Sequence, residues 1–345
     1  MVRLWGDFPV ITTVADDITS ENIDEVYPQY FPKQNTELEA YQQIEKDLLD
    51  AVLYAPDNTP GNKTLFTKSV ARTLLAKIYA EKPLRDYTKV IQYCDEVKAD
   101  GFDLVDDFSD LFGMNAAGTD AKMRNTKESI LEAQFTSGAG NWCTWMFGRD
   151  LVNWNNNFTW AKWVTPSRDL ISAFKQEGDE VRFKESIVYY DCNWSNYYPS
   201  DNYPFMYKCR SANSSIIKYR YADVLLLKAE ALIMQDTPDL EGAADIIDKV
   251  RDRAKLGALP TSVRSNKNAM LNALLKERRL ELAFEGQRWF DLVRLDKVEE
   301  VMNAVYAKDS GRKAQIYTFD KNSYRLPIPQ SVIDANDKIH QNPGY

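Results

Sequence analysis

Tryptophan and asparagine crowd one segment of the chain in a combination that suits carbohydrate binding. Residues 141–163 read NWCTWMFGRDLVNWNNNFTWAKW. A pyranose ring presents an apolar C–H face that stacks on a flat aromatic side chain, and its hydroxyl groups need amide and guanidinium partners. The predicted ligand contacts in this segment are Asn141, Trp142, Trp145, Arg149, Trp154 and Trp160.

A second segment, from Tyr189 to Tyr203, has the same character and reads YYDCNWSNYYPSDNY. It adds Trp194, Tyr197 and Tyr198 to the predicted ligand contacts. The competing interpretation is structural, because tryptophan is highly buried on average. We assign Trp163 to the core for that reason, and Trp160, three residues before it, fits either interpretation. The tryptophans at 142, 145 and 154 lie in sequence with little regular period to bury them, which favours exposure.

The histidine count limits the chemistry that the chain can perform. His340 is the single histidine, so a Ser-His-Asp triad, a Cys-His pair or a mixed histidine metal site would have to use it. The formal net charge is −8, and no cluster of lysine and arginine stands out, which argues against nucleic-acid binding. We expect no catalytic residue, no metal ion and no cofactor.

The cysteines also give little sign of chemistry. The four lie far apart, at 94, 143, 192 and 209, without CxxC spacing. Cys94 falls inside a helical pattern and is most simply a small buried side chain. Cys192 and Cys209 flank the tyrosine-rich segment and could form a disulfide there, although sequence does not set the geometry that a disulfide needs.

Paired carboxylates near the C-terminus raise the question of glycoside hydrolysis. Residues 276–294 read KERRLELAFEGQRWFDLVR, which predicts a charged helix interrupted at Gly286. Acidic and basic residues alternate there with leucine and phenylalanine, a pattern that favours an ion-pair network between helices. The acids Asp106, Asp107 and Asp110 could bind calcium, but they lack the EF-hand spacing and glycine, so a solvated loop is the better interpretation.

Helical patterns occupy two stretches, residues 36–100 and 216–296, and predict a mainly α fold built on helical pairs of tetratricopeptide-like size. Thr36 followed by Glu39 predicts a capping box at the first helix. Between the two stretches, residues 101–215 predict a loop-rich insertion with short strands, such as 129–135 and 187–190. Residues 297–345 predict an extended tail, which contains Pro327 and Pro329.

Several blocks resemble the SusD/RagB family of surface glycan-binding lipoproteins. The charged block at 276–294 and the tail YRLPIPQSVIDANDKIHQNPGY, from Tyr324, resemble its C-terminal signature. Four earlier blocks also resemble family motifs: VRLWGDFPV from Val2, KESILEAQF from Lys127, WVTPSRDLISAFKQEGDEVRF from Trp163, and IIKYRYADVLLLKAEALIMQ from Ile216.

This resemblance implies one SusD-like domain over residues 1–345, with a tetratricopeptide-like scaffold. It implies an outer-membrane, cell-surface lipoprotein that is not an enzyme, and that captures oligosaccharides or polysaccharides for a SusC-like TonB-dependent transporter in nutrient uptake by Bacteroidota. Family members carry an export signal, a lipidated cysteine and several helices before the block at Val2. We therefore expect this chain to be an N-terminally truncated version of a longer protein, with the signal peptide and lipid anchor absent from it.

Three alternatives remain at the level of sequence. RagB-like members of the family handle peptides, although the density of aromatic residues here favours a sugar. A glycoside hydrolase would need two carboxylates about 5–10 Å apart in a cleft. A tetratricopeptide adaptor would bind a protein helix in a groove and would not need the middle segment for binding.

Overall fold

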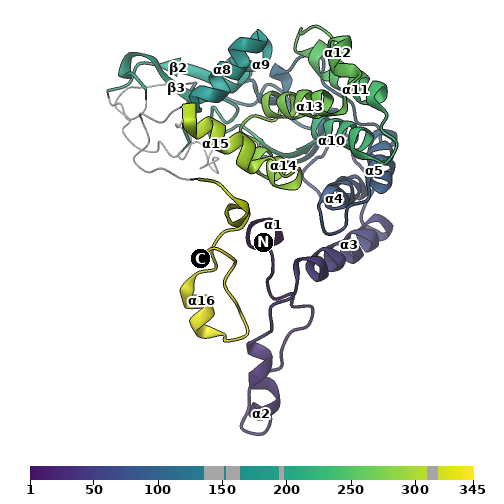
Figure 1. Cartoon of the computed structure of the whole chain (residues 1–345), viewed down its shortest axis with the longest axis vertical. Helices are drawn as coiled ribbons and strands as arrows, with labels where there is room; N and C mark the ends of the chain where they lie inside the picture. The colour runs from purple at the N-terminus through teal and green to yellow at the C-terminus, as the bar shows by residue number, and fades with distance from the viewer. Residues whose placement is uncertain (136–150, 153–163, 194–197, 309–317) are drawn as a thin grey trace. The chain divides into compact units, whose positions relative to one another are not determined.

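The computed structural model describes residues 1–135, 151–152, 164–193, 198–308 and 318–345 (Figure 1). Within these ranges helices predominate, and the strands form two two-stranded sheets, which confirms the predicted mainly α class. The chain divides into two compact units that we describe separately. Unit 1 comprises Met1–Leu48, Glu81–Arg85 and Trp289–Tyr345, and unit 2 comprises Leu49–Ala80 and Asp86–Arg288.

Helices that pack side by side form the scaffold of unit 2. Helix α4 packs on α5, and α10 packs on α5, α11 and α13, as the predicted helical-pair scaffold requires. Helix α10 lies at the centre, and most of its residues are buried, because its sequence is apolar on nearly all sides. The bounds of these helices are Lys68–Ala80 (α4), Tyr87–Ala99 (α5), Tyr221–Met234 (α10), Leu240–Arg253 (α11) and Lys267–Glu281 (α13).

Unit 2 also contains two antiparallel strand pairs. Strand β1 (Ser129–Ala133) pairs with β4 (Ile216–Arg220), and β2 (Ile187–Tyr190) pairs with β3 (Tyr203–Met206). The predictions of strands at β1 and β2 are confirmed. The prediction that helix begins at residue 216 is wrong, since residues 216–220 form β4 and the helix begins at Tyr221.

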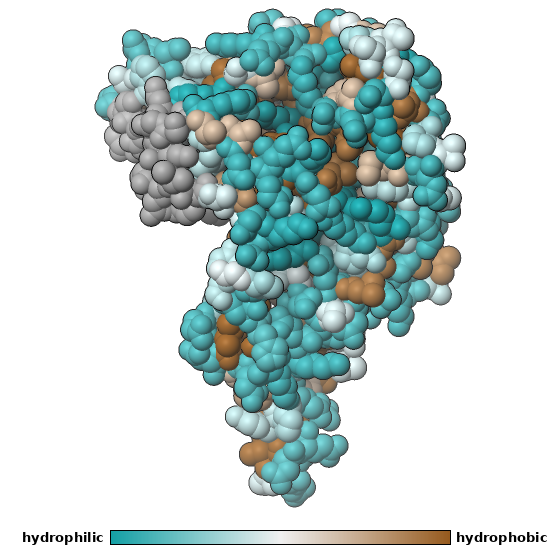
Figure 2. Space-filling model, in the orientation of Figure 1, coloured by the Kyte–Doolittle hydropathy of each residue, from teal (hydrophilic) through white to brown (hydrophobic). Residues whose placement is uncertain are grey.

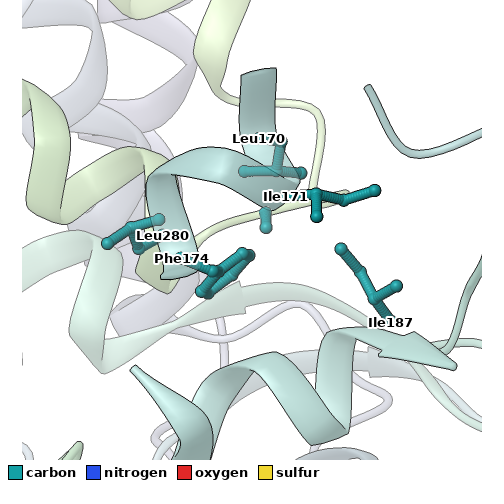
Figure 3. Packing of buried hydrophobic residues seen from close by; sticks show 6 residues of the cluster. Leu170, Ile171, Phe174, Ile187 and Leu280 are labelled. Carbon is teal, nitrogen blue, oxygen red and sulfur yellow. The ribbon is translucent and has the colours of Figure 1, made fainter. Parts of the chain in front are cut away.

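Two short helices connect the strand pairs to the scaffold. Helix α8 (Arg168–Glu177) begins at Ser167, whose side chain accepts a hydrogen bond from the Leu170 amide, and ends at Gly178 in the left-handed conformation. Helix α9 (Glu180–Ser186) follows and leads directly into β2. Figure 3 shows Leu170, Ile171 and Phe174 of α8 gathered with Ile187 and Leu280, so this cluster joins α8, β2 and α13. The remaining elements of unit 2 are α6 (Ser109–Phe112), η2 (Ser200–Asn202) and α12 (Thr261–Arg264).

Unit 1 contains both termini and the larger part of α3 (Glu37–Tyr54). The predicted capping box of α3 is confirmed, because the Glu39 amide donates to the Thr36 hydroxyl at 3.2 Å and the Thr36 amide donates to the Glu39 carboxylate at 2.8 Å. The other elements of unit 1 are α1 (Val2–Trp5), α2 (Ile23–Val26), η1 (Tyr27–Tyr30), α14 (Arg288–Arg294), α15 (Val298–Lys308), η3 (Lys321–Tyr324) and α16 (Gln330–Ala335). The first residue of α14, Arg288, is assigned to unit 2.

The C-terminal region differs from the prediction in two places. The charged block at 276–294 forms two helices, because α13 ends at Glu281 and α14 begins at Arg288. Phe284 and Gly286 both have positive φ in the connecting turn, which places the break earlier than Gly286 alone predicted. The tail is extended around its prolines but helical at α15 and α16.

The surface of the face shown in Figure 2 is mainly hydrophilic, with smaller apolar patches among the hydrophilic side chains. None of the helices in the described part of the chain is long and apolar enough to cross a membrane.

Candidate functional site

Tyr198 is the predicted ligand contact that the structure describes. Its ring is partly buried, with the Arg168 guanidinium 4.5 Å from the ring centroid and the Tyr203 ring 5.7 Å away. Its hydroxyl donates a 2.6 Å hydrogen bond to the Pro166 carbonyl oxygen. Tyr198 thus joins neighbouring pieces of chain, and its contact with a ligand stays a prediction. The other predicted contacts lie outside the described residues: Asn141, Trp142, Trp145, Arg149, Trp154, Trp160, Trp194 and Tyr197.

An apolar cluster surrounds Tyr198 on the β2–β3 pair. Its buried members are Leu151, Cys192, Tyr203 and Phe205, and the partly buried side chains packed against it include Tyr190 and Tyr198. We call these six residues the anchor cluster. The register of the pair places Tyr190 opposite Tyr203, so the two strands supply aromatic rings to the same place.

Chain ends next to both predicted ligand-binding segments contact the anchor cluster. The Leu151 amide, next after residues 136–150, donates to the Arg210 carbonyl at 2.8 Å, and the Leu151 carbonyl accepts from the Tyr190 hydroxyl at 2.7 Å. Thr165, just after residues 153–163, is hydrogen-bonded to the Tyr203 hydroxyl at 3.2 Å. Cys192 and Tyr198 lie on either side of residues 194–197 and belong to the same cluster as Leu151, while Thr165 is joined to it through Tyr203.

A buried ion-pair network lies in the scaffold of unit 2, centred on Glu281 of α13. The Glu281 side chain is fully buried and pairs with Arg182, Arg220 and Arg253, from α9, β4 and α11 respectively. Burial raises the pKa of Glu281, but the charges of Arg253, Arg220 and Arg182 outweigh burial and hold this pKa well below its usual value. Glu281 is therefore charged at neutral pH and ties three elements to α13.

Neighbouring carboxylates extend the network. Glu277 accepts from Arg182 at 2.5 Å, and Glu285 accepts from Arg220 at 2.7 Å and from Lys208 at 2.6 Å. The predicted ion-pair role of this block is confirmed, and the network joins more elements than the two helices that we expected. These carboxylates are buried against cations, so they do not form the pair facing a cleft that glycoside hydrolysis requires.

Metal binding finds no support in the described part of the chain. Asp107 and Asp110 both pair with Lys122, at 2.8 and 2.7 Å, and Asp106 pairs with Lys127 at 3.2 Å. The hydrogen bond from Lys122 is the main cause that lowers the pKa of Asp107 to about 2. Within the described residues, no group of three or more His, Cys, Asp and Glu side chains is placed to hold a metal ion.

The described cysteines behave as packing residues. Cys94 is buried, and its thiol donates to the Val224 carbonyl at 3.4 Å, as a small core side chain would. Burial raises the pKa of the Cys94 thiol above its usual range. Cys192 and Cys209 are also buried, and the structure forms no disulfide between them.

A shallow depression of about 180 Å³ lies between α5, α10 and α11. Its rim carries Lys228, which pairs with Asp95 at 2.5 Å, and Lys249, which pairs with Asp103 at 2.7 Å. The rim charges are thus already compensated within the protein. A tetratricopeptide adaptor would hold a partner helix in a groove, and the small volume of this depression disfavours such binding here.

Sequence inspection missed three basic residues that bind partners distant in sequence. Arg168, Lys208 and Arg210 are isolated basic residues in the sequence and form no recognisable motif. The available signal was weak: Lys208 and Arg210 lie two and four residues after the buried strand YPFM, which ends at Met206. Their roles depend on contacts with residues that are distant in sequence, such as Glu285 and Leu151.

The chain is similar to known SusD proteins in sequence and in fold. The model of the SusD family matches residues 198–345. SusD-like protein P2 of Formosa agariphila is 28% identical over the whole chain, which covers 71% of that protein. A SusD-like protein from Bacteroides fragilis has a similar structure, with a TM-score of 0.75 and 21% identity over the whole chain, which covers 76% of that chain.

Two further solved structures that share this fold bind glycans. A laminarin-binding SusD-like protein has a TM-score of 0.70 at 24% identity, with 100% of this chain and 75% of that one covered. Surface glycan-binding protein A of Bacteroides thetaiotaomicron, in complex with laminarihexaose, has a TM-score of 0.74 at 19% identity, with 99% of this chain and 74% of that one covered. The match of the family model to residues 198–345, the relative that aligns along the whole chain and the shared helical fold together make this chain similar to proteins of the SusD/RagB family.

Proposed function

We propose that this protein binds glycans at the cell surface, through side chains of the segments that the anchor cluster holds. One observation carries the proposal: Leu151, which follows residues 136–150, packs in the same cluster as Cys192 and Tyr198, which lie on either side of residues 194–197. Segments that are attached to the fold at neighbouring positions can present their side chains to one ligand. The laminarin-binding and laminarihexaose-bound proteins of the same fold support a sugar as that ligand.

The proposed contacts are Asn141, Trp142, Trp145, Arg149, Trp154, Trp160, Trp194, Tyr197 and Tyr198. Aromatic rings would stack on sugar rings, while the amide and guanidinium groups would bond the hydroxyls. Each such hydrogen bond replaces one with water and contributes little net free energy. We therefore expect weak affinity for a single sugar and stronger binding for an oligosaccharide that spans several contacts.

The second part of the proposal concerns the fate of the bound glycan. We propose that the full-length protein is an outer-membrane lipoprotein that delivers oligosaccharides to a SusC-like TonB-dependent transporter. Similarity to proteins of the SusD/RagB family supports this partner. Binding without hydrolysis fits that role, and the buried, paired state of Glu277, Glu281 and Glu285 supports it.

Isothermal titration with laminarihexaose, followed by other β-glucan and α-glucan oligosaccharides, tests the binding function. The decisive variant is Trp142→Ala/Trp145→Ala, with Tyr54→Ala as a matched control, because Tyr54 is an aromatic residue 83% exposed on α3 and outside the proposed contacts. We expect the double variant to lose about 2 kcal/mol or more of binding free energy, from two stacking platforms, and the control to bind normally. Equal affinity in both variants, with both folded, would contradict the placement of the site.

A further inference from the structure

Residues 11–31 of unit 1 form a loop that leaves most of its side chains in solvent. The loop contains α2 and η1, and Figure 1 shows α2 at its tip. The backbones of Phe8 and Asn35 form an antiparallel bridge at its base, with N···O distances of 3.2 and 3.1 Å. The C-terminal tail adds a second attachment, because the Lys338 ammonium donates to the Phe31 carbonyl oxygen at 2.9 Å. We call residues 11–31 the acidic loop, for the charge described below.

The acidic loop exposes large apolar side chains. In this fully described stretch, Val26 is the one buried residue. Val14 is 97% exposed and Ile11 is 70% exposed. Four more apolar residues are between 41% and 52% exposed: Ile18, Ile23, Tyr27 and Tyr30. Single exposed apolar residues are common on any protein, whereas six in one short loop are typical of an interaction surface.

The same loop carries negative charge that the described part of the chain does not balance. Its five carboxylates are Asp16, Asp17, Glu21, Asp24 and Glu25. The chain has no lysine, arginine or histidine from residue 4 to residue 32. Elsewhere, exposed carboxylates such as Asp106 and Glu300 pair with lysine, but none of these five pairs with a cation among the described residues. The loop therefore offers apolar contact area and free carboxylates together.

The two properties together indicate the chemistry of the partner. A second copy of this chain would not balance the charge, because its formal net charge is −8 and no lysine and arginine cluster stands out. Anionic lipid would repel the loop. A sugar ring stacks on flat aromatic side chains, and four of the six exposed apolar residues are aliphatic. The partner that fits is a protein whose surface presents lysine or arginine around apolar pockets.

We infer that the acidic loop is a docking surface for the transporter of the proposed function, on a transporter face that is basic around apolar pockets. This inference rests on that proposed function. The apolar side chains would supply affinity by leaving water, and the carboxylates would supply specificity and a fast, salt-dependent encounter. The attachments at Asn35 and Phe31 fix the base of the loop, so less of the chain must be ordered on docking.

Biolayer interferometry with the purified transporter in detergent micelles tests the apolar contribution. The loop variant is Ile11→Ser/Val14→Ser. Its matched control is Leu53→Ser/Tyr54→Ser, which replaces two exposed apolar residues of α3 outside the loop. All four side chains are exposed, so we expect both variants to fold as the wild type does. The loop variant should bind the transporter about tenfold or more weakly, while the control keeps the wild-type affinity.

A second pair of variants tests the charge. Asp16→Lys/Asp17→Lys reverses two loop carboxylates, and Asp50→Lys/Asp236→Lys makes the same change at exposed positions outside the loop. The loop variant should associate with the transporter about tenfold or more slowly at low salt, and the control should not. At about 0.5 M NaCl the difference should shrink, because salt screens exposed charges.

The outcomes separate the docking surface from the proposed function. If the wild type binds the transporter and both loop variants bind it equally well, the inference is overturned and the proposed function stands. If the wild type does not bind the transporter, delivery to it fails and the docking surface falls with it, whatever the glycan titration gives. Loop variants that lose glycan binding but keep transporter binding would make the loop a sugar site, which also overturns the inference.

Discussion

Replacing Glu281 with glutamine should destabilise the protein strongly, because it removes the central negative charge of the buried ion-pair network. The carboxylate is fully buried and pairs with Arg182, Arg220 and Arg253. Neutralising one partner of a buried ion pair costs about 3–5 kcal/mol, since the remaining charge stays out of water. Each arginine keeps a second carboxylate partner, supplied by Glu277, Glu285 or Glu128, so we expect a loss of about 3 kcal/mol, at the lower end of this range.

Urea denaturation measures this loss as a shift of the unfolding midpoint, provided that the slope of the free energy against urea stays the same. Glu300→Gln is the matched control, because Glu300 pairs with Lys297 but is 63% exposed. An exposed pair of this kind contributes little to stability. The control should therefore unfold close to the wild-type midpoint.

The pH dependence of unfolding gives an independent test of the same reasoning. The pKa of Glu281 is lowered in the folded protein, so its stabilising contribution is present above the unfolded pKa of about 4.3 and is lost as the pH falls below that value. Glu281→Gln should therefore show a shallower loss of stability between about pH 5 and pH 3 than the wild type. A loss below about 1 kcal/mol at pH 7 would refute the reasoning, and so would an unchanged acid dependence, because both would show that the network does not depend on this charge.

Three further predictions concern single residues. Burial lowers the pKa of Lys208 to about 8, so the unfolded state binds more protons than the folded state between about pH 8 and 10. Relative to Lys208→Met, the stability of the wild type in urea melts should therefore rise by about 1 kcal/mol from pH 7 to 9. Parallel pH profiles of the two proteins would contradict this. Tyr198→Phe removes the hydrogen bond to Pro166 and should cost about 1 kcal/mol in thermal unfolding without loss of the fold, whereas an equal or higher melting temperature would show that this bond does not anchor the segment. Thr36→Ala removes the capping box of α3 and should cost about 1 kcal/mol by the same assay, with Thr36→Ser retaining most of that stability; equal losses in both variants would contradict a hydroxyl cap.

Local signals allowed much of the scaffold to be predicted. The apolar stripes of α3, α4, α5 and α11, the capping box at Thr36 and the short strands β1 and β2 depend on residues close in sequence. Strand β4 was missed because its residues continue smoothly into the apolar pattern of α10, and only its pairing with β1 makes it extended. The break after Glu281 was also misplaced. The turn there brings the Glu285 carboxylate to Lys208 and Arg220, which are 77 and 65 residues away in sequence.

In the candidate site too, local sequence signals were readable and long-range contacts were not. Residue types alone suggested sugar binding in the Trp/Asn-rich segment, because stacking and hydroxyl recognition have a recognisable composition. The way in which the segment is held depends on long-range contacts, such as Leu151 with Arg210 and Thr165 with Tyr203. Composition does not predict such contacts. Tyr198 illustrates the limit, since it was selected as a ligand contact and the structure shows it bonding Pro166 and stacking with Arg168.

A glycan-array screen of the folded protein, run beside Trp142→Ala/Trp145→Ala, tests the central claim most directly. Circular dichroism and a urea melt first establish that both proteins are folded to the same extent. We predict that the wild type binds one class of glycan and that the double variant loses this binding. A folded wild type that binds no glycan, but binds members of a peptide array, would contradict the sugar-binding function and favour the peptide-binding alternative within the family.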